Sequence, residues 1–279
     1  MMNHRHAVLL SGIALWSLAG CGGADTTQSG AKDEELSQGI TFEEFRAQTN
    51  QETESGLFIV DGDIAVDEQG LRDFYETSVR SGQLIINQAN RVDTKWTDTQ
   101  KLNLTYCVSK ATFGTRYAEM VQAMNAATAA WEAAAKVNFV HLSQYDTNCT
   151  SRQSKVLFDV NQASSTSPGA RAFFPNTARQ ARNVILNSAT WTDTTGQFPI
   201  VGVLRHELGH ALGFRHEHIR PETGNSDAFC TENSNWRALT TYDSASVMHY
   251  PWCPGSTGDG SLSLSSKDIQ GAQAVYGAP

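Results

Sequence analysis

The residues with the clearest capacity for chemistry lie in one stretch of this 279-residue chain, residues 198–218, which read FPIVGVLRHELGHALGFRHEH. His206 and His210 are four residues apart, so on a helix both imidazoles project from the same side. Two nitrogen ligands of one zinc ion need that spacing. Glu207 follows the first histidine, where a carboxylate lies close to the metal without being forced to bind it. The pattern predicts a zinc site with a neighbouring general base.

A helix and a sharp turn have to position these residues. Six apolar residues form one face of the expected helix: Ile200, Val203, Leu204, Leu208, Ala211 and Leu212. Gly213 can adopt a left-handed conformation and end that helix, after which the chain can turn and present His216 as a third ligand. The full pattern is HExxHxxGxxH. Histidines on an ordinary amphipathic surface helix are the competing interpretation.

The extended motif resembles that of the metzincin metallopeptidases, and residues 246–250 (SVMHY) resemble their Met-turn. The resemblance places Met248 beneath the metal. In the astacin branch the tyrosine two residues later is a further zinc ligand, so Tyr250 is a candidate ligand; a simply packed tyrosine is the alternative. Glu217 and Arg220 also match astacins, but the match ends at residues 221–224. The bacterial dual-action HEIGH metallopeptidases are similar in motif and in host context.

The expected fold class is α+β, a metzincin-like zincin fold. It has a twisted mixed five-stranded sheet, a long backing helix, an active-site helix and a smaller irregular C-terminal subdomain that ends in a helix. Hydrophobic periodicity supports a helix over 114–136 and a terminal helix from Ser266. Strand-like runs are found at 102–109, 137–142, 155–160, 171–174 and 183–187.

The resemblance implies a zinc-dependent endopeptidase with one catalytic Zn²⁺ on His206, His210 and His216. In that mechanism a metal-bound water attacks the peptide carbonyl, Glu207 serves as the general base, and Tyr250 stabilises the oxyanion. The substrate would be a protein or peptide lying extended along an edge strand, for which residues 171–174 are the candidate. The remaining histidines that could compete as ligands are expected to be structural: His141, His218 and His249.

Asp63 is the candidate for a latency switch. Astacin prosegments carry a Phe-x-Gly-Asp motif whose aspartate occupies the zinc, and residues 60–63 (VDGD) are similar except for valine in the first position. A carboxylate that displaces water would remove the nucleophile, and a cut between residues 65 and 100 would then activate the protein. A hairpin turn at Asp61–Gly62 explains the same residues without any metal.

The first twenty residues have the layout of a secretory signal, with Arg5 before a short apolar run. The sequence Leu18-Ala19-Gly20-Cys21 resembles a bacterial lipobox, which would put a lipid on Cys21; an ordinary signal peptide is the alternative. We therefore expect a signal peptide at 1–20, an acidic tether and prosegment at 21–95, and a catalytic domain at 96–279. The protein would be exported, either as a lipoprotein of the bacterial cell envelope or in secreted form, and would meet a membrane only through that lipid.

Four further cysteines in an exported chain predict two disulfides, with three pairings possible. Cys107–Cys149 and Cys230–Cys253 are favoured because each closes a local loop. Metal binding by these cysteines is disfavoured because none are two to four residues apart.

The net charge of −8 argues against nucleic acid as a partner. All of this negative charge belongs to residues 21–90, which hold 14 acidic and 4 basic side chains, a net charge of −10. We expect a monomer. The main alternative to a peptidase is a catalytically idle surface lipoprotein that acts as a binding or adhesion module. The presence of Glu207 argues against that alternative, because such relatives usually lose the catalytic glutamate.

Overall fold

The computed structural model describes residues 42–60, 62–75, 86–89, 92–164, 168–188, 190, 198–223, 230 and 236–279. The expected signal peptide and the lipidation site Cys21 lie outside these ranges. None of the helices formed by the described residues has the length and apolar character needed to cross a membrane. The chain from Gly39 to Pro279 forms one compact unit.

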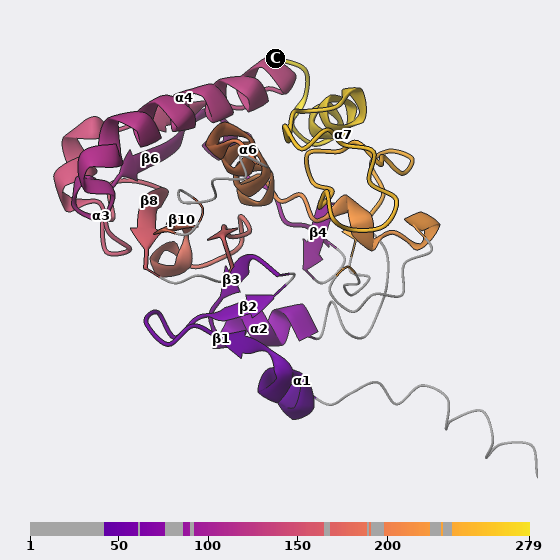
Figure 1. The fold of residues 1–279 in the computed structure, drawn as a ribbon, viewed down its shortest axis with the longest axis horizontal. Coiled ribbons are helices and arrows are strands. Elements are labelled where there is room, and N and C mark those ends of the chain that lie inside the picture. The colour runs from indigo at the N-terminus through magenta and orange to yellow at the C-terminus, as the bar shows by residue number, and fades with distance from the viewer. Residues whose placement is uncertain are drawn as a thin grey trace, which may run out of the picture. The chain divides into compact units, whose positions relative to one another are not determined.

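A five-stranded mixed sheet organises the structure (Figure 1). Its strand order is β7 (Phe139–His141), β6 (Leu104–Val108), β8 (Phe158–Ala163), β10 (Asn183–Asn187) and β9 (Ala170–Arg171). The first four strands are parallel, whereas β9 pairs antiparallel with β10 at one edge. The inner strands β6 and β8 are largely buried, as expected where parallel strands are covered by other elements. The predicted mixed five-stranded sheet is confirmed.

Two long helices pack together beside this sheet (Figure 1). They are α4 (Tyr117–Ala134), the backing helix, and α6 (Ile200–Ala211), the helix of the histidine motif. Helix α4 buries a stripe with helical spacing that includes Met120, Met124 and Trp131. The Trp131 indole donates a hydrogen bond to the Arg205 carbonyl of α6, 2.9 Å away. The backing helix thereby fixes the position of the motif helix.

The predicted helix over 114–136 begins later than expected. A short helix α3 (Lys110–Phe113) and a 3-10 turn η3 (Gly114–Arg116) precede α4. Gly114 has a φ of +54°, which interrupts regular helix geometry. The terminal helix α7 (Ser266–Tyr276) begins where expected, with Ser265 and Asp268 forming a capping box.

Residues 42–75 fold into a small module against the main sheet (Figure 1). It contains α1 (Phe42–Gln48), a three-stranded meander and α2 (Glu68–Phe74); the strands are β1 (Asn50–Gln51), β2 (Phe58–Val60) and β3 (Ile64–Val66). The module has its own apolar cluster, whose members from this segment are Phe42, Phe58, Val60, Ile64, Val66, Leu71 and Phe74. Phe174, from the segment after β9, belongs to the same cluster.

A second small sheet joins β11 (Trp236–Arg237), β4 (Ile86–Ala89) and β5 (Val92–Asp93). Short 3-10 turns complete the described elements: η2 (Gln100–Leu102), η4 (Ser143–Asn148), η5 (Arg179–Ala181), η6 (Glu217–Ile219) and η7 (Pro221–Thr223).

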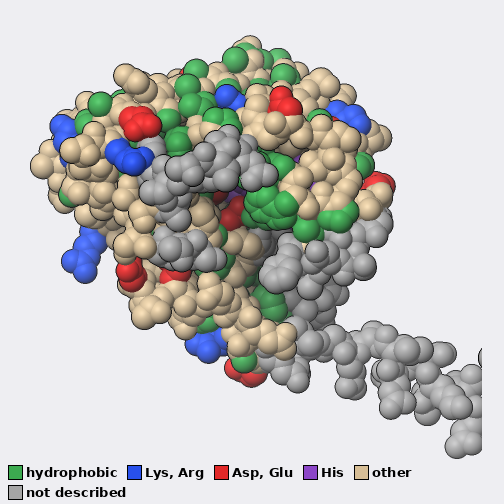
Figure 2. Space-filling model, viewed as in Figure 1, with side chains coloured by type: hydrophobic (Ala, Val, Ile, Leu, Met, Phe, Trp, Pro, Cys, Tyr) green, Lys and Arg blue, Asp and Glu red, His purple; other side chains and the backbone are tan. Residues whose placement is uncertain are grey.

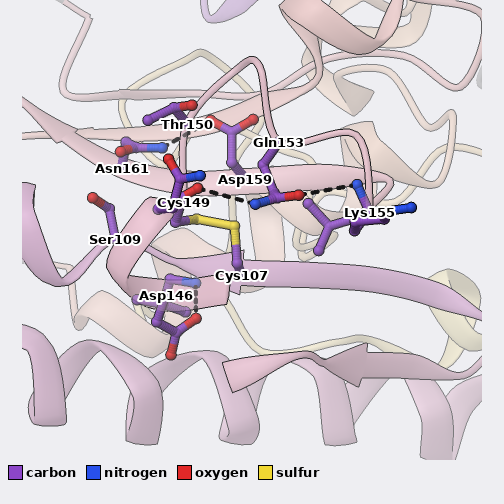
Figure 3. Close-up of a disulfide and its surroundings, with 12 residues drawn as sticks. Cys107, Ser109, Asp146, Cys149, Thr150, Gln153, Lys155, Asp159 and Asn161 are labelled. Atoms are coloured by element: carbon purple, nitrogen blue, oxygen red, sulfur yellow. Dashed lines mark hydrogen bonds between the residues drawn. A yellow bond between two sulfur atoms is a disulfide. The ribbon is translucent and has the colours of Figure 1, made fainter. Parts of the chain in front are cut away.

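Both favoured disulfides are present. Cys107–Cys149 joins strand β6 to the segment after η4 (Figure 3). Its Cα–Cα distance is 5.7 Å. Cys230–Cys253 closes a 23-residue separation in the C-terminal subdomain.

Candidate metal centre

Three histidines meet at one buried point. The Nε2 atoms of His206, His210 and His216 lie 3.0–3.2 Å from one another. All three side chains are at most about 5% exposed. Ligands about 2.0–2.1 Å from a tetrahedral zinc ion would be separated by about 3.3–3.4 Å. The separation of the three nitrogens therefore matches three corners of a zinc coordination sphere.

Backbone carbonyls fix the orientation of two of the rings. The Nδ1 of His206 lies 2.8 Å from the Val247 carbonyl, and that of His210 lies 2.7 Å from the Phe214 carbonyl. Because a carbonyl only accepts hydrogen bonds, each Nδ1 carries the proton and each Nε2 presents a lone pair. Burial lowers the pKa of His210 to about 4, which keeps the ring neutral at pH 7.

These donor atoms fit a zinc ion. Lone pairs that face one another at 3.0–3.2 Å repel unless a cation lies between them. Two carboxylate oxygens of residues that line the same cleft, Asp63 Oδ1 and Glu207 Oε2, are buried and have no hydrogen-bond partner among the described residues. Asp63 and the three histidines form the one group of potential metal ligands found in the described part of the chain. A divalent cation would satisfy this group.

Gly213 makes the turn that brings in the third histidine. Its φ is +98°, and a Cβ at this position would lie 2.2 Å from the Thr94 carbonyl oxygen. Asn87 donates its backbone N–H to the Gly213 carbonyl at 2.8 Å. Only glycine fits this conformation and this close approach, so the interpretation of Gly213 as the end of the helix holds.

The Met-turn packs beneath the histidines through contacts that sequence reasoning missed. A Cβ on Gly209 would lie 2.4 Å from the Met248 sulfur, so this glycine in the middle of α6 is what lets Met248 approach. Asp268 of α7 accepts hydrogen bonds from the Ser246 hydroxyl (2.5 Å) and the Val247 N–H (2.8 Å). The capping-box spacing from Ser265 to Asp268 was the available sequence signal, but it did not predict the contact with the Met-turn.

Asp63 reaches the histidine cluster from the N-terminal module. Its carboxylate oxygens lie 3.3 Å from the Nε2 atoms of all three histidines. The Tyr250 hydroxyl donates to Asp63 Oδ2 at 2.7 Å. Burial alone would raise the pKa of Asp63, but its interactions with His216, His210 and His206 outweigh burial and hold that pKa well below its usual range.

The turn and metal interpretations of residues 60–63 are compatible. Strands β2 and β3 form a hairpin in which Val60 pairs with Ile64, so the connection spans residues 61–63. It is one residue longer than the expected two-residue turn, and Asp63 belongs to it. Gly62 has a φ of +86°, and a Cβ there would lie 3.2 Å from the Tyr250 hydroxyl. The hairpin is what carries Asp63 to the histidines.

Glu207 lies at the edge of a cleft beside the cluster. Burial, followed by the nearby charge of Asp63, raises the pKa of Glu207 well above its usual range. The cleft holds about 540 Å³ and is mostly apolar, with walls that include Phe198, Val203 and Trp252. Figure 2 shows acidic and histidine atoms between hydrophobic side chains in the middle of the face it presents.

The remaining candidate histidines lie in other environments. His141 contacts Asp146 at 3.0 Å, and Tyr117 also hydrogen-bonds that carboxylate. His249 lies 3.0 Å from the Tyr242 hydroxyl. His218 stacks on His216 but does not join the cluster of converging Nε2 atoms.

The N-terminal module also docks on the edge strand that was proposed for substrate. Ala65 donates its N–H to the Ala172 carbonyl (3.1 Å), and Ala172 donates to the Asp63 carbonyl (3.0 Å). This makes a parallel bridge between Ile64 and Ala172, immediately after β9. Glu52 of the module accepts two hydrogen bonds from the Arg171 guanidinium, at 2.7 and 2.9 Å.

Comparisons with known proteins agree with this site. Residues 95–222 match the matrixin family model, a range that contains all three histidines and ends before Met248. The chain is 25% identical over 190 residues to human neutrophil collagenase, covering 66% of this chain and 33% of that protein. It is 41% identical over 64 residues to a bone morphogenetic protein 1 homolog from Strongylocentrotus purpuratus, covering 18% of this chain and 10% of that protein. The chain thus spans about a third or less of the length of these relatives.

Among solved structures, the chain is similar to high choriolytic enzyme 1, a hatching enzyme zinc-protease from Oryzias latipes (medaka fish). The TM-score is 0.44 at 19% identity, covering 67% of this chain and 96% of that chain. The matrixin match over residues 95–222, with the mixed α+β sheet and its motif helix, supports a metzincin zinc metallopeptidase. The resemblance that was inferred from the sequence motifs is confirmed.

Proposed function

We propose that this metzincin is an exported endopeptidase that uses one zinc ion and is held latent by its own N-terminal module. The observation that carries the proposal is the convergence of three buried histidine Nε2 atoms within 3.2 Å, with Glu207 beside them at a cleft. The two disulfides and the secreted character of collagenase-type relatives are consistent with export. Anchoring through Cys21 remains a prediction from the lipobox.

His206, His210 and His216 would hold the zinc as three neutral ligands. A zinc ion on such ligands supplies a Lewis acid for the scissile carbonyl and lowers the pKa of bound water to about 7. Glu207 would accept the proton from the attacking water. Its raised pKa lets it hold that proton and deliver it to the leaving amine. Once Asp63 has left, the Tyr250 hydroxyl would donate a hydrogen bond to the carbonyl oxygen as negative charge develops there.

Latency follows from where the module lies. Asp63 fills the position next to the three histidines that a substrate carbonyl and a water would need. Residues 63–65 pair with Ala172 and so cover the edge against which an extended substrate would pair. Glu52 adds an ion pair with Arg171, and Phe174 adds an apolar contact with the module. The module blocks both the metal position and the peptide-binding edge.

Casein or gelatin hydrolysis by the wild type and by Glu207→Gln tests the peptidase mechanism, with zinc content measured in both. We expect activity in the wild type after release of the module, and its loss in Glu207→Gln while zinc stays bound. Equal activity in the two proteins would refute the mechanism. Absence of activity in both, with a bound protein partner, would support the binding-module alternative.

Asp63→Ala tests latency in the uncleaved chain. We expect it to show some peptidase activity that the uncleaved wild type lacks, because the carboxylate no longer fills the metal position, although the module still pairs with Ala172. Unchanged latency would remove the switch hypothesis and leave the hairpin turn as the whole explanation of residues 60–63.

A further inference from the structure

Trp252 lines the cleft beside the histidine cluster. Its side chain is 62% exposed, which is unusual for so large an apolar residue. Its indole stacks on Tyr250 with ring centroids 4.5 Å apart and planes inclined by 25°. It also meets Phe198, just before α6, in an edge contact at 5.8 Å. Contacts with these two rings, rather than burial, fix the position of the indole.

Three buried histidine rings also lie against Tyr250. Their centroids are 4.2 Å (His216), 4.6 Å (His218) and 5.6 Å (His206) from that of the phenol. The phenol is thus packed among buried histidines and the exposed Trp252. The Tyr250 backbone N–H also donates to His218 Nδ1 at 3.1 Å. His218 is 1% exposed and forms a fixed inner wall.

This arrangement restricts how the Tyr250 hydroxyl can move. In the structure it points at Asp63 beside the histidine cluster. A rotation of the phenol out of its plane has to displace one of these neighbouring rings. The histidine rings are buried, so the exposed Trp252 is the neighbour that sets how freely the phenol leaves its position.

We propose that Trp252 is a positioning residue that acts through Tyr250. It restricts the orientations of the phenol so that the hydroxyl stays beside the histidine cluster. The inference rests on the proposed function, specifically on the role of Tyr250 in donating to the carbonyl oxygen. A confined donor has lost its alternative orientations before the substrate arrives, which raises kcat rather than substrate affinity. One aromatic pair is strong enough to change such a population by about two- to tenfold.

A double-mutant cycle tests the proposal in the Asp63→Ala background after release of the module, where no carboxylate occupies the histidine cluster. We expect Trp252→Ala to lower kcat about two- to tenfold with little change in KM, and Trp252→Phe to keep most of the activity. Adding Trp252→Ala to Tyr250→Phe should cause no further loss. An equal loss in both backgrounds, or a change in KM alone, would overturn the proposal because Trp252 would then act on the substrate or the fold.

A measurement without turnover separates this proposal from the proposed function. In fluorotyrosine-labelled protein, the ¹⁹F signal that disappears in Tyr250→Phe belongs to Tyr250. We expect Trp252→Ala to narrow or split that signal, because the phenol gains mobility, while the other tyrosine signals stay in place. A Tyr250 signal of unchanged width and number of components would overturn the proposal. A mobile phenol in a chain without peptidase activity would instead refute the proposed function alone.

Discussion

Replacing Glu52 with glutamine should loosen the N-terminal module without unfolding the protein. Glu52 and Arg171 form a bidentate ion pair between the module and the edge strand β9. The side chain of Arg171 is 4% exposed and that of Glu52 is 19% exposed. Asn183 accepts a further hydrogen bond from the same guanidinium, so the arginine keeps one neutral partner in the variant.

The size of the effect follows from that burial. Removing one partner of a fully buried ion pair costs about 3–5 kcal/mol. Glu52 is partly solvated and glutamine retains one accepting oxygen, so we expect about 1–3 kcal/mol. Because every 1.4 kcal/mol corresponds to a factor of ten, the population of the undocked module should rise about five- to 150-fold.

Hydrogen exchange at the module's contact with the edge strand measures this population. The N–H groups of Ala65 and Ala172 make the two hydrogen bonds across the contact, so their exchange should accelerate by that factor. Glu68→Gln is the matched control, because Glu68 pairs with Arg46 inside the module and both side chains are exposed. That pair should contribute at most about 1 kcal/mol.

Two outcomes would refute this reasoning. Unchanged protection of Ala65 and Ala172 in Glu52→Gln would show that the ion pair does not hold the module in place. Equal acceleration throughout the sheet would show that the variant had lost global stability instead.

The remaining predictions concern pH and the ligand-bearing turn. Burial opposes ionisation of Glu52, but Arg171 outweighs burial and holds the pKa of Glu52 below its usual value. The ion pair therefore stabilises the folded protein fully above about pH 4.5, the pKa of Glu52 in the unfolded chain. This stabilisation is lost as the pH falls through the lower pKa that Glu52 has in the folded protein. The stability difference between wild type and Glu52→Gln, measured by chemical denaturation, should therefore shrink from pH 7 to below pH 4; a constant difference would contradict this assignment. Gly213→Ala should lower the free energy of unfolding by more than the roughly 1–3 kcal/mol expected for a non-glycine residue at positive φ. It should also weaken zinc binding, because the added Cβ clashes with the Thr94 carbonyl. Gly56→Ala is its control, with a φ of +71° and open space around it; equal losses of stability and zinc in the two variants would contradict the steric argument.

The sequence predicted the elements whose residues carry strong local signals. The spacing of His206, His210 and His216, together with Gly213, is enough to predict the cluster of histidines. Hydrophobic periodicity located α4 and α7, and β10 has the bounds that were expected for it. The disulfide pairing was also predicted, because local loop closure favoured the two bridges that are present.

Contacts between distant segments could not be predicted in this way. Nothing in the neighbourhood of Glu52 indicates that it pairs with Arg171, 119 residues later. The role of Gly209 depends on how closely Met248 packs against α6, and periodicity does not report that distance. Trp252 likewise had no sequence signal, because its importance comes from the ring on which it stacks.

The proposed peptidase depends on three histidines that hold one catalytic zinc ion. Native mass spectrometry of the wild-type full chain, Glu207→Gln and His210→Ala, with peptidase activity measured on the Glu207→Gln sample as well, tests this most directly. We expect one zinc per wild-type chain, one zinc per inactive Glu207→Gln chain, and none in His210→Ala. A wild type purified with zinc in the buffer yet carrying none, or His210→Ala with a full zinc complement, would contradict the account.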